Sequence, residues 1–204
     1  MGWKVSMIIA ELKGRSINEK QILKVLGWTS VRQMEERSLA QCLLPADQTV
    51  SIGYYRDCAI ICDDFQFAPF HFSYYISPNE KKLQHLFMDA EVLTIACHSS
   101  INFHGYALAA EGRRQRYKQV SHEIEREDFG DWMEEEREIY DRATFIEGVK
   151  YWKMDHDPKE LYEESQLMEE FTFRIGKRLL GVNLIEEEGE YLLEQIPFHP
   201  YKQV

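Results

Sequence analysis

Apolar residues recur along the chain at two spacings, every second position in some segments and every third or fourth position in others. The first spacing is typical of a strand and the second of an amphipathic helix. Strands are predicted for residues 3–12, 50–54, 58–62, 92–97, 103–110 and 113–120. Because short turns join the second strand to the third and the fifth to the sixth, we expect antiparallel hairpins.

Four helices are predicted where a capping residue is followed three positions later by Glu, whose carboxylate can bind the free amides of the first turn. Glycines mark the ends of two of them, Gly27 after the first helix and Gly181 after the last, which is either one helix or two. The capping pairs are Ser16 and Glu19, Ser77 and Glu80, Asp131 and Glu134, and Asp157 and Glu160.

Three other segments have weaker patterns. Residues 65–76 are aromatic and extended but contain Pro69, so they are predicted as an edge strand or a packed loop. Residues 28–44 give no clear prediction, and residues 191–196 are expected to form a last strand. The elements together favour an α+β fold, with an antiparallel or mixed β-sheet and about four helices packed mainly on one face. A doubly wound parallel sheet is the alternative.

The composition indicates a single globular domain over residues 1–204, since there is no linker-like or repeated segment. Acidic residues outnumber basic ones by 35 to 24, and the net charge of -11 opposes attraction to nucleic acids and to anionic membranes. We expect neither partner. The apolar runs fall short of the roughly 20 residues of a membrane span, no leader is recognised, and four cysteines suit a reducing, cytoplasmic compartment.

Two histidines bracket a predicted turn. If the turn between residues 97 and 103 is centred on Ile101, His98 and His104 are cross-strand neighbours about 5 Å apart and could share a metal ion, a proton or an anion. A tighter turn at Ser99 and Ser100 leaves His98 alone at a strand end, because a one-residue change in register moves every side chain to the other face. Ser99 and Asn102 join the histidines as candidate catalytic or ligand-binding residues of the turn.

A short basic segment is the second candidate site. On a strand, Arg114, Arg116 and Lys118 share a face and could bind a phosphate or an acidic partner. The alternative is structural: these residues pair with nearby acids of residues 123–127, or they keep an edge strand from pairing with another chain.

Metal and cofactor sites have little support in the sequence. Cys58 and Cys62 lie about 13 Å apart if they share one strand, too far for a disulfide or one tetrahedral ion, so both are predicted to be core residues. Asp155, His156 and Asp157 form a small potential ligand cluster, but Asp157 is expected to cap a helix. Because no Gly-rich phosphate loop is present either, we expect no metal and no cofactor.

Several short motifs resemble a bacterial family of uncharacterised proteins of similar length. The motifs are the opening residues 1–4, residues 53–63, residues 97–99 with 103–107, and the helix end at residues 177–181. This resemblance implies no activity and no catalytic residues, and it only directs attention to His98 and Ser99.

Two hypotheses about function follow. The first is a cytoplasmic binding or interaction domain without its own catalysis, which binds a protein partner or forms a homo-oligomer, because no complete catalytic constellation is present. The second is a small hydrolase or a metal-dependent enzyme with its site around His98 and His104. Binding of an anion by the basic segment is a third, narrower idea.

Overall fold

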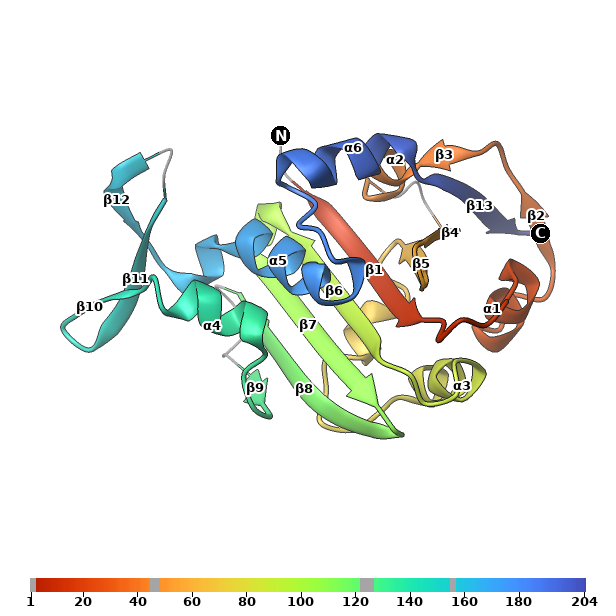
Figure 1. The fold of residues 1–204 in the computed structure, drawn as a ribbon, viewed down its shortest axis with the longest axis horizontal. Coiled ribbons are helices and arrows are strands. Elements are labelled where there is room, and N and C mark those ends of the chain that lie inside the picture. Colours follow the sequence, from red (N-terminus) through yellow and green to blue (C-terminus); the bar gives the residue numbers. More distant parts are fainter. Residues whose placement is uncertain (1–2, 45–47, 122–126, 155–156) are drawn as a thin grey trace.

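The computed structural model describes residues 3–44, 48–121, 127–154 and 157–204 (Figure 1). Its main element is a ten-stranded sheet with the strand order β2-β13-β4-β5-β1-β6-β7-β8-β9, in which β3 also pairs with β13. All these pairings are antiparallel. The strands are β1 (Lys4–Glu11), β2 (Val31–Gln33), β3 (Arg37–Ser38), β4 (Thr49–Tyr55), β5 (Cys58–Asp63), β6 (Val92–His98), β7 (Phe103–Ala110), β8 (Arg113–Val120), β9 (Glu127–Phe129) and β13 (Pro197–Gln203).

A second, three-stranded sheet lies apart from the first and has the order β10-β11-β12. Its strands are β10 (Thr144–Ile146), β11 (Val149–Met154) and β12 (Asp157–Tyr162). The described residues also form six α-helices, so the prediction of an α+β fold is confirmed. They are α1 (Glu19–Val25), α2 (Leu39–Cys42), α3 (Pro78–Leu86), α4 (Glu134–Tyr140), α5 (Met168–Leu180) and α6 (Glu187–Gln195).

Both faces of the large sheet are buried. Met7 and Ile9 of β1 belong to a core cluster that includes buried residues of α2, α4, α5 and α6. Ile8 and Ala10, which alternate with them, belong to a second cluster with residues of α1 and α3. This alternation follows from the two-residue period of a strand. Because helices contribute to the clusters on both sides, the expectation of about four helices mainly on one face is not confirmed.

The N-terminal caps show how far local chemistry determines the helices. Ser77 caps α3 as predicted, accepting from the Glu80 N–H at 3.2 Å while a Glu80 oxygen accepts from the Ser77 N–H at 3.4 Å. In α1 the cap is Asn18 instead of Ser16, paired with Gln21. α4 begins at Glu134 after Met133, so here too the predicted cap, Asp131, lies two residues early.

Two predicted elements near the C-terminal end are wrong. Asp157 opens the strand β12, and the long helix begins only at Met168, although it ends before Gly181 as expected. Residues 191–196 lie mostly in α6, and the last strand comes directly afterwards, at Pro197–Gln203. Proline disfavours a central strand, yet β13 pairs on both sides, and its Pro200 carbonyl accepts from the Met34 N–H at 2.8 Å.

The remaining uncertain segments fall into short pieces. Residues 28–44 hold β2, β3 and the single turn of α2. Residues 65–76 form a loop with one 3-10 turn at Ala68–Phe70 and no strand. The described part of the chain contains no helix long and apolar enough to cross a membrane.

A bulge interrupts β8 and decides where its side chains point. Leu108 of β7 is opposite Arg116, but the next residue, Ala109, is opposite Arg114, so Gln115 is an extra residue on β8. Gly130 packs against this bulge in the left-handed region, with φ +87°, and a Cβ on it would lie 2.1 Å from the Gln115 carbonyl oxygen. Only glycine fits there.

We expect Gly130→Ala to destabilise the fold by about 3 kcal/mol, the sum of a left-handed alanine and a forced displacement of the bulge. Gly148→Ala is the matched control, because Gly148 has φ +84° but no heavy atom within 4 Å of a Cβ placed on it. Its cost should be about 1 kcal/mol. Chemical denaturation measures both values. Equal losses would show that the close approach to Gln115 contributes nothing.

Candidate functional site

The structure separates the two candidate histidines. Residues 99–102 form the turn, so His98 is opposite Phe103 and His104 is opposite Cys97. The two imidazoles therefore point to opposite faces of the sheet. His104 is buried and stacks on Phe171 of α5, with ring centroids 4.9 Å apart, whereas His98 lies near Phe65 with centroids 5.9 Å apart. They cannot share a ligand, so the turn centred on Ile101 is wrong.

Ser99 and Asn102 both have structural roles in this turn, Ser99 through hydrogen bonds and Asn102 through its backbone conformation. The Ser99 hydroxyl accepts from the Trp3 N–H at 2.6 Å and donates to the Trp3 carbonyl at 3.1 Å, which fastens the turn to the chain that enters β1. Asn102 has φ +45°, a left-handed conformation that Asn tolerates well. Ser100 contacts an imidazole, with its hydroxyl 2.9 Å from Nδ1 of His98.

The basic residues of β8 do not share one face, because the bulge at Gln115 turns Arg114 away from the other two. Arg114 points to the side of α3, where its guanidinium makes two 2.6 Å hydrogen bonds to the buried carboxylate of Glu80. The pKa of Glu80 lies above its ordinary value, because burial raises it by more than the hydrogen bonds from Arg114 lower it. The predicted common face for Arg114, Arg116 and Lys118 is therefore wrong.

Arg116 and Lys118 lie on the opposite side, and both are buried. Two nitrogens of Arg116 donate to the Glu136 carboxylate of α4, at 2.8 and 2.7 Å, and Arg116 also pairs with Asp128. Lys118 contacts Glu164 and the hydroxyl of Tyr140. Of the acids predicted as partners, residues 123 and 125 lie outside the described residues. Arg114, Arg116 and Lys118 are neutralised inside the protein, which leaves them little capacity for an external phosphate.

The other candidate ligands form no site either. Asp155 and His156 lie outside the described residues, and all four cysteines are free and buried, as predicted for core residues. Within the described ranges, no three side chains of His, Cys, Asp or Glu come close enough together to hold a metal ion.

A polar cluster that the sequence did not indicate joins the two ends of the chain. The Glu19 carboxylate of α1 contacts Nδ1 of His199 at 2.6 Å and the hydroxyl of Tyr201, both on β13. The hydrogen bond to Glu19 raises the pKa of His199. Nε2 of the same ring lies 3.5 Å from Glu36. Because 180 residues separate Glu19 from His199, no local motif could have revealed the pair.

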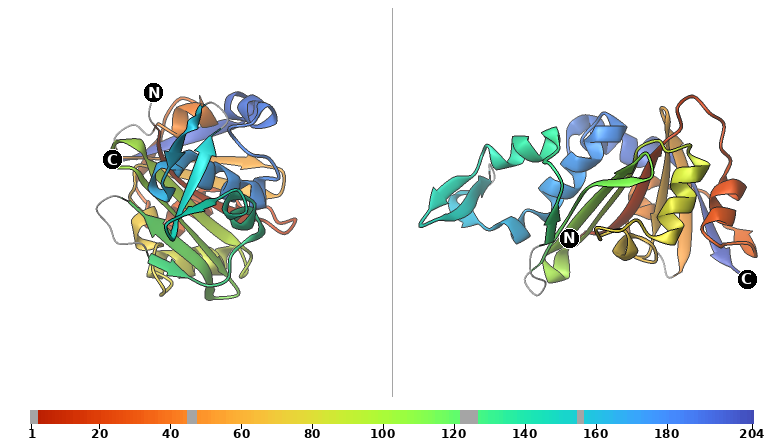
Figure 2. Two further views of the ribbon diagram at one scale, coloured as in Figure 1. Left: turned by 90° about the vertical axis from the view of Figure 1, so that its left-hand side faces the viewer. Right: turned by 90° about the horizontal axis from the view of Figure 1, so that it is seen from below.

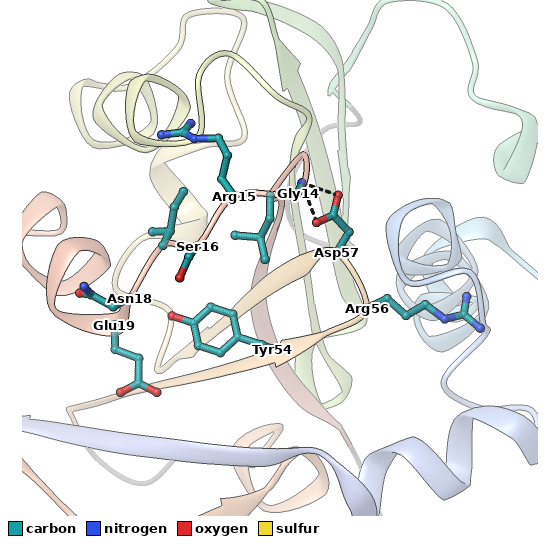
Figure 3. Close-up of a pocket in the computed structure, with 10 residues that line it drawn as sticks. Gly14, Arg15, Ser16, Asn18, Glu19, Tyr54, Arg56 and Asp57 are labelled. Carbon is teal, nitrogen blue, oxygen red and sulfur yellow. Dashed lines mark hydrogen bonds between the residues drawn. The ribbon is translucent and has the colours of Figure 1, made fainter.

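A hollow of about 630 Å³ lies beside this cluster (Figure 3). Tyr54 extends into it, and burial together with the Glu19 charge raises the pKa of its hydroxyl to about 12. The arginines of the lining point outwards, Arg15 to the Leu86 carbonyl and Arg56 to the Leu180 carbonyl. The hollow therefore lacks the convergent charges that anion binding or acid–base catalysis requires.

The three-stranded sheet projects from one end of the molecule (Figures 1 and 2). We call its described residues, 144–154 and 157–162, the arm. Its tip is a two-residue turn, Glu147 and Gly148, both with positive φ, which is typical of tight hairpins. Trp152 anchors its base: the indole is buried and donates to the Ile139 carbonyl of α4 at 2.9 Å.

The arm exposes four apolar side chains, of which Phe145 is the most accessible at 66%. The others are Ile146, Val149 and Leu161. A hollow of about 580 Å³ lies between the arm and the end of β8, lined by Phe145, Val149 and Trp152 on one side and by residues 163–165 on another. Sequence patterns missed this surface because the capping pairs at Asp131 and Asp157 predict a helix on either side of it and no strands.

Searches against known protein families, curated proteins and solved structures found no match to the chain.

We expect Glu136→Ala to destabilise the protein by about 3 to 5 kcal/mol, because the buried Arg116 guanidinium loses the carboxylate that accepts two of its hydrogen bonds. Glu138→Ala, on the same helix, is the control: Glu138 is exposed and pairs at the surface with Arg174, so its loss should cost below about 1 kcal/mol. Urea denaturation measures both. A loss for Glu136→Ala as small as for the control would mean that the buried pair contributes no net stability.

We expect His199 to titrate above its ordinary pKa, and Glu19→Gln to bring that pKa back down. Since the folded pKa is raised, the contact stabilises the protein below the unfolded value of about 6.5, and this stabilisation is lost as the pH rises through the folded pKa. NMR titration of the ring measures the shift. Glu36→Gln, which removes a more distant and more exposed carboxylate, should change it less. A pKa unaffected by Glu19→Gln would refute the assignment.

Proposed function

We propose that this chain is a non-catalytic protein-binding domain and that the arm is its binding element. One observation carries the proposal: exposed apolar side chains gather on an arm that projects from the body of the molecule (Figure 1). Phe145 shares one face of the arm with Lys150, and Ile146 and Val149 lie on the other face, so the arm exposes apolar groups on both sides. Exposed apolar groups are costly in water, and several of them on one element mark an interaction site.

The construction of the arm supports this role. Its base is held by Trp152 and by the Lys150 ammonium, which lies 4.5 Å from the ring centroid of Tyr140. A partner would therefore meet a preorganised hairpin, which reduces the entropy lost on binding. Within the described residues β10 pairs only with β11, so its outer edge also offers free backbone groups to an added strand.

The partner we propose is a protein, either a different chain or a second copy of this one. The net charge of -11 disfavours nucleic acids and anionic membranes. Four free, buried thiols suit the reducing cytoplasm, which is the compartment we propose. The resemblance to a bacterial family is consistent with a bacterial source.

The alternative of a hydrolase or metal-dependent enzyme has one contact in its favour, the Ser100 hydroxyl 2.9 Å from Nδ1 of His98, but this pair lies in an exposed turn and borders none of the hollows described above. His98 and His104 point to opposite faces of the sheet. The Ser99 hydroxyl is already hydrogen-bonded to the backbone N–H and the carbonyl of Trp3. A catalytic serine needs a base within hydrogen-bond reach and room for a substrate. We therefore do not propose this activity.

We expect Phe145→Ser to weaken binding of the partner at least tenfold, because truncation of an aromatic hot-spot side chain typically costs about 2 kcal/mol or more. Phe70→Ser is the matched control, since Phe70 is 68% exposed but lies outside the arm. The partner is first isolated by affinity capture and then purified for titration calorimetry. Sedimentation of the chain alone tests self-association.

Both variants should retain the melting temperature of the wild type, as surface substitutions usually do. A wild-type chain that stays monomeric and captures no protein contradicts the proposal. Equal affinity of the Phe145→Ser variant and the wild type for the partner also contradicts the proposal.

A further inference from the structure

The helices α1 and α3 form a second distinctive surface, far from the arm. They lie side by side, with their buried residues in the same core cluster, at the end of the molecule opposite to the arm (Figures 1 and 2). Every charged side chain that these helices expose is a lysine, in a protein with a net charge of -11. The exposed lysines are Lys20 and Lys24 of α1 and Lys81 and Lys82 of α3.

The acids of the same two helices do not neutralise these lysines. Glu19 is occupied by His199 and Tyr201, and Glu80 is buried under α3 in its pair with Arg114. None of the four lysines has an ion pair within the described part of the chain. Screening limits the influence of distant charges to about 8 Å at physiological ionic strength, so a ligand over the exposed sides of these helices meets the four lysines more strongly than the acids elsewhere on the molecule.

An apolar hollow lies between the two helices. It has a volume of about 380 Å³ and is lined by Val25 of α1 and Leu86 of α3, with Lys81, Lys82 and His85 around it. An apolar floor with a cationic rim matches a ligand of the opposite arrangement, an apolar group flanked by negative charges.

We propose that this surface, which we call the lysine face, binds an acidic peptide segment of another protein. An apolar side chain of the peptide enters the hollow between Val25 and Leu86, and the flanking carboxylates lie against the lysines. The inference goes beyond the proposed role of the arm, because it concerns a different surface and states the chemistry of what binds there.

A peptide fits these observations better than a nucleic acid or a membrane does. A short segment meets only the lysine face, whereas an extended polyanion also approaches the acidic remainder of the molecule. The exposed residues of α1 and α3 include neither arginine nor an aromatic side chain other than His85, so bidentate contacts to phosphates and stacking platforms for bases are lacking.

The test uses the full chain and three fluorescent peptides in fluorescence anisotropy. The first probe combines glutamates with leucines at every fourth position, the second replaces its glutamates with lysines, and the third replaces its leucines with alanines. We expect the first to bind and both others to bind at least tenfold more weakly. Lys81→Glu combined with Lys82→Glu should weaken binding of the first probe at least tenfold, because two attractive contacts become repulsive.

A matched double variant controls for net charge. Arg137→Glu combined with Lys202→Glu also changes four charge units, from -11 to -15, but at exposed positions outside both the lysine face and the arm. It should retain binding within about twofold, with melting temperatures confirming that both variants fold. Salt should weaken the wild-type complex.

Several outcomes would overturn the proposal. One is a first probe that binds no better than its lysine or alanine versions. Another is an equal loss in the two double variants, which would indicate an effect of net charge alone. The third is lysine-dependent binding of phosphatidylserine vesicles or of duplex DNA without binding of the acidic peptide. A result against the lysine face leaves the arm untouched, since the Phe145→Ser experiment concerns the other end of the molecule.

Discussion

A cation that is buried without a counter-charge costs several kcal/mol, and β8 buries three of them, Arg114, Arg116 and Lys118. Each therefore requires an acid from another part of the chain. Glu80 brings α3 to one side of the strand, Glu136 brings α4 to the other, and Glu164 brings the segment that leads into α5. This requirement positions helices on both faces of the sheet, and with α4 it positions the base of the arm.

The bulge at Gln115 makes this arrangement possible. With regular alternation all three cations would point to one side, and Arg114 could not reach Glu80. The extra residue directs Arg114 to α3, and Gly130 allows another part of the backbone to lie against the distortion. One inserted residue thus distributes the positive charge of a single strand between two layers of helices.

Local patterns predicted the elements whose signals are local. The hairpin of β4 and β5, the meander of β6 to β8 and the cap of α3 at Ser77 all follow from residues that are close in sequence. The patterns failed at Asp157, where a Pro and a Glu at the right spacing suit a helix but the residues pair in β12 instead. Propensity is a weak signal when strand pairing competes with it.

The candidate site was less predictable than the fold, because its geometry depends on single-residue details of register. A turn of four residues instead of five places His98 and His104 on opposite faces, and the bulge does the same to Arg114 and Arg116. Neither detail has a signal in the composition of the segment. The contact of Glu19 with His199 depends on the whole topology, so it could only be seen in the folded chain.

The position of β13 has a consequence for how the molecule forms. This strand lies between β2 and β4, so residues 197–203 pair with residues 31–33 and 49–53. Long loops must close before such distant pairs can form, which slows folding. On the ribosome the edge of β4 stays open until the chain has been made through β13, and a chaperone that covers this edge would protect the nascent protein from aggregation.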